Sequence, residues 1–191
     1  MTTDIDIEYH AKYFELLASK LEGYAELCII SFIDLYKKSE RNMKGIVEKA
    51  IDENSMQEIA KRLAQIAQKY NIKIKTCSED VDLSAIGIEH AKCIDDELIS
   101  KIIGQKININ KDKNQREICG CVSSIDIGAY NTCRHGCLYC YANFSNNTVE
   151  NNLLKHDPNS PMLIGNIEPE DKITDRKMES YLNKQLDLFD G

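Results

Sequence analysis

Three cysteines lie close together late in the chain, at Cys133, Cys137 and Cys140, within the segment NTCRHGCLYCYAN. This C-x3-C-x2-C spacing places three thiolates on one tight loop. Three thiolates suit three corners of an iron-sulfur cube and leave the fourth iron without a protein ligand. Because an open iron can bind a substrate or a cofactor, the segment predicts a reactive iron-sulfur centre.

Zinc and free thiols are the alternatives to an iron-sulfur cluster at this loop. Structural zinc prefers four ligands, so a zinc ion here would need one more, from Cys119, Cys121 or His135. If Cys119 or Cys121 instead ligated the cluster, no iron would remain open. Free or redox-sensing thiols are the third interpretation. The identity of the fourth ligand therefore decides whether the centre is reactive.

The other three cysteines lie in or beside predicted regular elements. Cys77 ends a predicted parallel strand, where α/β barrels hold their catalytic groups, and could act as a hydrogen-atom donor beside a radical site. An ordinary small buried residue is the alternative there. Cys28 lies inside an apolar strand and is expected to pack. Cys93, one helical turn after His90, predicts either a ligand pair or a half-buried helix face.

An α/β fold is predicted to position these thiols. Residues 8–22 repeat apolar side chains at helical spacing, and residues 26–36 form a continuous apolar run, typical of a strand buried on both faces. Ser55 and Glu58 resemble a capping box at the start of a second amphipathic helix. Residues 72–77 predict another strand. Strand, helices and strand indicate a right-handed βαβ crossover and a partial (β/α) barrel-like parallel sheet.

The chain is expected to divide into three segments. Residues 1–104 form the α/β region, with further helices predicted at 40–51 and 96–104. Residues 105–166 form an irregular cysteine-cluster region, which a metal centre rather than a core would hold together. Residues 167–191 form a charged tail.

Composition restricts the location and the partners. No apolar run approaches the ~20 residues that span a bilayer, so we expect a cytoplasmic protein with no membrane partner. Clustered thiols in that compartment are more often metal ligands or catalytic groups than disulfides. The net charge of −7 argues against nucleic-acid binding over the whole surface. The lysine-rich segment 101–116 predicts either a local nucleic-acid contact or a solvated loop.

The cysteine loop carries a family resemblance. Cys133, Cys137, Tyr139 and Cys140 match the motif of the radical S-adenosylmethionine enzymes, in which three cysteines hold a 4Fe-4S cluster and the cofactor chelates the fourth iron. Residues 119–143 resemble the C-terminal signature of the bacterial domain-of-unknown-function family 1848. The resemblance extends to ISFIDLYKK near residue 31, GIEHAKCID near residue 87 and HDPNSPMLIG near residue 156.

The resemblance implies a 4Fe-4S cluster, S-adenosylmethionine as a second cofactor, an electron donor as partner, and a longer N-terminal portion that this chain lacks. Two departures from the radical enzymes are visible: the cluster motif comes late, and no Gly-Gly-Glu-like segment is present. The first hypothesis is a radical enzyme acting in DNA repair or nucleic-acid modification, as spore photoproduct lyase does in the wider class. The second is a non-enzymatic sensor or DNA-clamp-associated module stabilised by an iron-sulfur cluster or zinc.

The tail carries a possible docking peptide. Gln185, Leu186, Leu188 and Phe189 lie in QLDLF, which resembles the pentapeptide that binds the bacterial sliding DNA clamp. The leucine and phenylalanine side chains would fill apolar pockets while the glutamine hydrogen-bonds at the rim. The alternative is a terminal amphipathic helix packed on the core.

Overall fold

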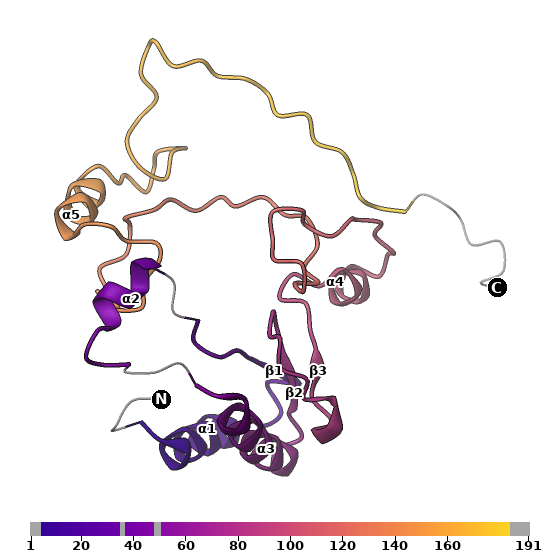
Figure 1. Ribbon diagram of the computed structural model, residues 1–191. Coiled ribbons are helices and arrows are strands. Elements are labelled where there is room, and N and C mark those ends of the chain that lie inside the picture. The colour runs from indigo at the N-terminus through magenta and orange to yellow at the C-terminus, as the bar shows by residue number, and fades with distance from the viewer. Residues whose placement is uncertain (1–4, 35–36, 48–50, 184–191) are drawn as a thin grey trace. The chain divides into compact units, whose positions relative to one another are not determined.

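The computed structural model describes residues 5–34, 37–47 and 51–183, and these form two compact units. The first, called the α/β unit, comprises the described residues 5–34, 51–124 and 180–183. The second, called the loop unit, comprises residues 37–47 and 125–179. Figure 1 labels the helices and strands of both.

The α/β unit is built on a three-stranded parallel sheet in the order β1-β2-β3 (Figure 1). Strand β1 spans Leu27–Ile30, β2 spans Lys73–Thr76 and β3 spans Glu89–His90. Parallel strands end at the same edge of a sheet, so the residues after Ile30, Thr76 and His90 come out on one side. This sheet and the cysteine-rich region that follows it confirm the predicted α/β class.

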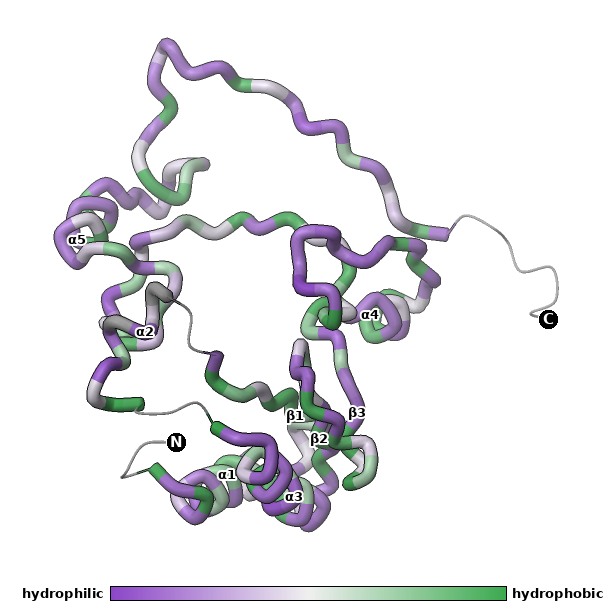
Figure 2. The backbone as a smooth tube through the Cα atoms, viewed as in Figure 1, coloured by the Kyte–Doolittle hydropathy of each residue, from purple (hydrophilic) through white to green (hydrophobic). Residues whose placement is uncertain are grey.

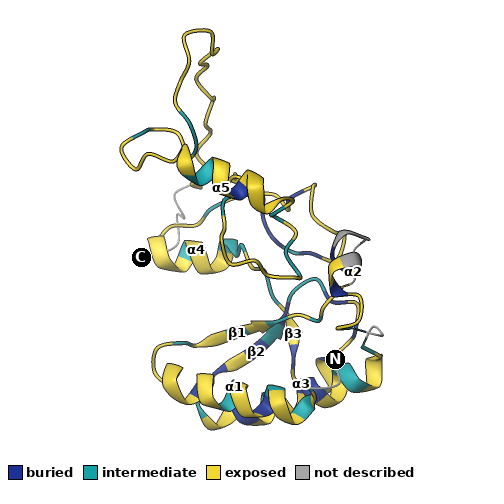
Figure 3. Cartoon of the chain, turned by 90° about the vertical axis from the view of Figure 1, so that its left-hand side faces the viewer, coloured by how far each residue is buried: buried dark blue, intermediate teal, exposed yellow. Residues whose placement is uncertain are grey.

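Helices α1 (Ile7–Leu21) and α3 (Glu53–Lys69) lie side by side against the sheet (Figure 3). Their apolar faces and the strands enclose the core, which consists of Ala11, Ala18, Ile59, Ala60, Leu63, Ile66, Ala67, Ile72, Ile74, Val81, Leu83 and Ile88. Strand β1 is not buried on both faces as predicted, because Leu27 and Ile29 remain 38% and 37% exposed. The helices cover only the face of β1 that carries its half-buried residues.

Helix α3 begins earlier than the capping box predicted. Its N-cap is Asp52, whose carboxylate accepts a hydrogen bond from the Ser55 backbone N–H at 3.0 Å. Ser55 therefore lies inside the first turn, because Asp52 is itself a strong N-cap. The helix ends at Lys69, and Asn71 follows with a φ of 56°.

Other elements are short. In the loop unit, α2 spans Lys37–Met43, earlier than the predicted 40–51, and α5 spans Asn146–Leu154, where no helix was predicted. In the α/β unit, a 3-10 turn spans Ser84–Ile86, and α4 spans Asp96–Ile103 as predicted, with Gly104 (φ 67°) closing it.

Beyond α4 the chain is irregular, as expected, except for helix α5. Residues 105–124 belong to the α/β unit, held by single bridges such as Lys111 to Val122. Residues 167–183 form no helix and are mostly polar (Figure 2). Across the part of the chain that the structure describes, every helix is too short or too polar to cross a membrane.

Candidate metal centre

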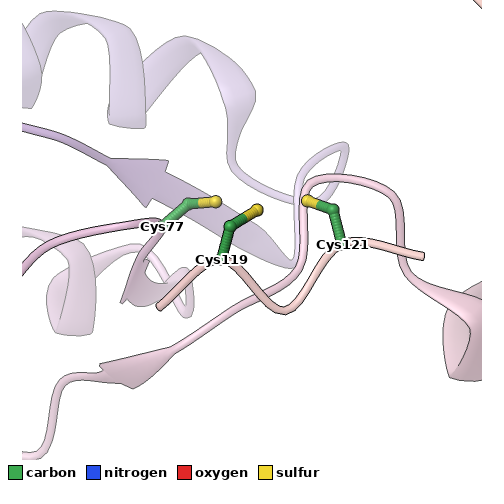
Figure 4. A group of neighbouring side chains, drawn as sticks. All are labelled: Cys77, Cys119 and Cys121. Atoms are coloured by element: carbon green, nitrogen blue, oxygen red, sulfur yellow. The ribbon is translucent and has the colours of Figure 1, made fainter. Parts of the chain in front are cut away.

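Three thiols from distant parts of the sequence converge in the α/β unit. The sulfur atoms of Cys77, Cys119 and Cys121 all lie within 4.8 Å of one another and point toward each other (Figure 4). Tetrahedral zinc with Zn–S bonds of about 2.3 Å separates its sulfurs by roughly 3.8 Å, so small movements would let these three share one ion. Within residues 5–34, 37–47 and 51–183, this is the only gathering of three or more Cys, His, Asp or Glu side chains of this kind.

The sheet and a tight turn position the three thiols. Cys77 directly follows β2, so its thiol lies at the C-terminal edge of the sheet, as predicted. Cys119 and Cys121 flank Gly120 on a turn in which the Cys119 N–H donates to the Arg116 carbonyl at 3.0 Å. Cys119 and Cys121 are 4% and 5% exposed, whereas Cys77 is half-buried.

An ion pair and a second hydrogen bond hold this turn on the sheet. The Arg116 guanidinium lies 2.6 Å from the carboxylate of Asp34, which follows β1. The same guanidinium donates to the carbonyl of Ser78, two residues after β2, at 3.5 Å. The otherwise irregular segment is thereby fixed where the parallel strands end.

Hydrogen bonds favour thiolate in this cluster. The backbone N–H groups of Cys93 and Ile94 point at the Cys121 sulfur, at 3.2 and 3.4 Å. Burial opposes ionisation of Cys119, but hydrogen bonds from the Ser78 hydroxyl and the Cys121 backbone outweigh it and lower the pKa of Cys119. Burial raises the pKa of Cys121, and hydrogen bonding from Ile94 only partly opposes this. The group is thus prepared for at least one negative charge.

The pairing predicted for His90 and Cys93 on one helix is wrong. His90 ends strand β3, and its Nδ1 lies 3.1 Å from the Thr76 hydroxyl oxygen. Cys93 lies in the connection before α4 and is exposed. The two residues therefore share no helix face. Cys28 lies in β1 and packs against the core, as expected.

The C-x3-C-x2-C loop lies in the loop unit, with a conformation closed by hydrogen bonds. The Asn131 N–H donates to the Ala142 carbonyl at 3.0 Å, so the two ends of the loop meet. The Asn143 side chain donates to the Cys133 carbonyl at 2.5 Å, and the Asn152 side chain donates to the Asn131 carbonyl at 3.1 Å. Gly136, with a φ of 66°, supplies a left-handed turn inside the loop.

A bidentate ion pair joins helix α5 to the same loop. The Arg134 guanidinium donates to both carboxylate oxygens of Glu150, at 3.0 and 2.7 Å. Cys133 and Cys137 are exposed and Cys140 is half-buried. The structure does not gather these three sulfurs as it gathers those of Cys77, Cys119 and Cys121. Their role as ligands stays a prediction.

Two neighbouring features were not anticipated. Glu79 is buried beside the end of β2, where its carboxylate accepts a hydrogen bond from the Phe32 N–H at 2.8 Å. Burial raises the pKa of Glu79, an effect that the Phe32 hydrogen bond opposes. The second is the approach of Cys93 to the buried thiols. Neither contact has a local sequence signal, because each joins residues far apart in the chain.

The predicted docking peptide cannot be placed in the fold. Gln185, Leu186, Leu188 and Phe189 lie outside the described residues.

The comparisons with known proteins identify a family but no function. The family model described as "Domain of unknown function (DUF1848)" matches residues 1–142. No curated protein and no solved structure matches the chain. The matched range contains the buried thiols as well as Cys133, Cys137 and Cys140, so a cluster of cysteines that could bind metal lies within the family domain. The chain belongs to the DUF1848 family, an uncharacterised domain family.

Proposed function

We propose that this chain is an iron-sulfur protein of the radical S-adenosylmethionine type, in which Cys133, Cys137 and Cys140 hold a 4Fe-4S cluster. The observation that carries the proposal is the C-x3-C-x2-C spacing on a loop already closed by hydrogen bonds and braced on α5. Because the loop is already closed, metal binding would cost less conformational entropy than it would in a flexible loop. Its three thiols are free of disulfides, and thiolate is the ligand that iron-sulfur clusters require.

The environment of the loop fits such a cluster. The exposure of Cys133 and Cys137 leaves their sulfurs accessible to iron. The His135 N–H points at the Cys133 sulfur at 3.5 Å, and hydrogen bonds to cluster sulfurs shift reduction potentials. When bound, the cluster would supply one-electron reduction of S-adenosylmethionine. The residues of this chain would position the cofactor and restrict access of water.

An unsatisfied acceptor beside the loop supports a second bound group. The Asn143 Oδ1 is buried, and no described residue donates a hydrogen bond to it. A buried acceptor without a donor costs about 1–3 kcal/mol. The amino group of S-adenosylmethionine, or a water that it orders, is a donor of the required kind. Asn143 would then connect the cofactor to the backbone of Cys133.

Nucleic acid is the substrate class that we propose. The support is the QLDLF peptide, since docking to the sliding clamp would raise the local concentration of this acidic protein at DNA. Binding of the isolated tail peptide to purified clamp, compared with a Phe189→Ala peptide, tests this step. Equal binding of the two peptides would refute docking to the clamp, but it would not affect the proposal of an iron-sulfur cluster.

The experiment for the cluster is anaerobic purification followed by iron, sulfide and electron paramagnetic resonance analysis. We expect iron and acid-labile sulfide in the wild type and their loss in the Cys133→Ala/Cys137→Ala variant. A Cys28→Ala variant is the matched control and should keep both. Addition of S-adenosylmethionine together with dithionite, which supplies the electron, should alter the resonance spectrum of the reduced cluster and yield methionine and 5′-deoxyadenosine. Wild-type protein without acid-labile sulfide would refute the proposal.

A non-enzymatic metal-stabilised module is the second candidate. It is favoured by the gathering of Cys77, Cys119 and Cys121, which fixes an irregular segment rather than opening a reactive site. This candidate predicts metal-dependent stability with no 5′-deoxyadenosine from cluster-loaded protein. Formation of 5′-deoxyadenosine would exclude it as the whole function.

A further inference from the structure

The spacing of Cys77, Cys119 and Cys121 suits a single ion better than a cluster. Their sulfurs lie within 4.8 Å of one another, whereas thiolates bound to different irons of a cube stand farther apart than thiolates that share one ion. With three sulfurs, a tetrahedral ion lacks one ligand.

Cys93 stands where that ligand is needed. Its backbone N–H donates to the Cys121 sulfur at 3.2 Å, so its Cα is held beside the cluster. Burial raises the pKa of Cys77, and the neighbouring Cys93 thiol raises it further. The Cys93 sulfur lies outside the 4.8 Å gathering of the other three, so a turn of this exposed side chain toward them would complete the set.

We propose that Cys77, Cys93, Cys119 and Cys121 form a closed four-thiolate site for one Zn²⁺ ion, separate in sequence and in ligands from the Cys133–Cys140 loop. Two of the ligands are almost fully buried, which suits a structural site from which water is excluded. Cys93 is exposed, so the ion has an entry path on that side. Zinc binding would release the thiol protons to solvent, with no redox step.

Backbone N–H groups offset part of the charge of four thiolates on Zn²⁺, which totals −2. Two backbone N–H groups donate to the Cys121 sulfur, as described above. The Arg116 guanidinium reaches the Ser78 carbonyl at 3.5 Å, next to Cys77.

The function of the site would be to hold the irregular segment in place. Cys77 follows β2, Cys93 precedes α4, and Cys119 and Cys121 lie on the later turn. One ion would join these three segments where few buried apolar side chains do so. Such crosslinks stabilise small domains whose cores are limited.

Cobalt substitution in the full-length chain tests the coordination. In the Cys133→Ala/Cys137→Ala background, which removes two of the three loop ligands, we expect one Co²⁺ per chain with the intense visible bands of tetrahedral thiolate coordination. Cys93→Ala should shift these bands and weaken zinc binding by more than about tenfold. His90→Ala and Cys28→Ala should leave the spectrum unchanged. Unchanged bands in Cys93→Ala would overturn the assignment of the fourth ligand.

Alkylation of the wild type gives a readout that does not depend on how the variants fold. With iodoacetamide and mass spectrometry, zinc should slow the labelling of Cys93 at least about tenfold, because a metal-bound thiolate is a weaker nucleophile. Cys28 provides the internal reference. Equal labelling of Cys93 with and without zinc would overturn the site. If the iron-sulfur proposal failed, the results expected here would not change, because neither experiment measures the loop cysteines.

Discussion

Zinc binding should raise the free energy of unfolding of this protein, and the increase should depend on how many cysteines bind the ion. We consider the Cys133→Ala/Cys137→Ala chain, in which two of the three loop ligands are absent and Cys77, Cys93, Cys119 and Cys121 remain. Free zinc at a hundred times its dissociation constant would raise the free energy of unfolding by about 2.7 kcal/mol. If removal of Cys93 weakens binding tenfold, the same zinc concentration would contribute only about 1.4 kcal/mol. The difference due to the Cys93→Ala change is then about 1.3 kcal/mol.

The assay is urea unfolding followed by circular dichroism, in chelator and again in zinc at fixed free concentration. Cys93→Ala should change the stability little in chelator, because Cys93 is exposed, and should lose about half of the zinc effect. Cys28→Ala is the matched control. Its half-buried side chain packs on the core, so its cost should be the same in both conditions. Equal zinc effects in Cys93→Ala and in its parent would refute the reasoning.

Three further outcomes follow from local contacts. Asp52→Ala should lower the free energy of unfolding by about 1 kcal/mol in urea titrations, because it removes the N-cap of α3, whereas Asp52→Asn should retain most of that stability. Gly120→Ala should lower the free energy of unfolding by about 1 kcal/mol more in the wild type than in a Lys92→Ala background, because its added Cβ would lie 3.2 Å from the Lys92 Cγ. If thermal unfolding showed that the two changes are additive, this close approach would be contradicted. Arg134→Ala should reduce the iron retained by the anaerobic protein after gel filtration, and Glu150→Ala should do the same, since either change frees the cysteine loop from α5; full iron retention in both variants would show that this brace is dispensable.

Periodic signals predicted the elements that lie in the α/β core. The helix expected at residues 8–22 appears at Ile7–Leu21, and the strand expected at 72–77 appears at Lys73–Thr76. Both have apolar faces that pack on the same core, so pattern and structure agree. Strand β3 contains only two residues, too few for any alternation to be recognised, and α5 is polar and was not predicted.

Of the two candidate metal sites, likewise, only the one with local spacing could be predicted from the sequence. The spacing of Cys133, Cys137 and Cys140 is local, so the sequence alone predicts a loop with three thiols. The gathering of Cys77 with Cys119 depends on the return of an irregular segment to the edge of the sheet, which no short-range pattern records. The sequence therefore indicated Cys119 as an extra ligand for the later loop or as a residue lining its active site, whereas the structure places it with Cys77.

The most direct test of metal binding by both thiol sets is the metal and sulfide content of the anaerobically purified full-length chain. We expect about four iron and four sulfide per chain, together with about one zinc. The Cys133→Ala/Cys137→Ala variant should lose the iron and sulfide and keep the zinc, while Cys93→Ala/Cys119→Ala should do the reverse. A wild-type chain that retains neither iron with sulfide nor zinc would contradict the account.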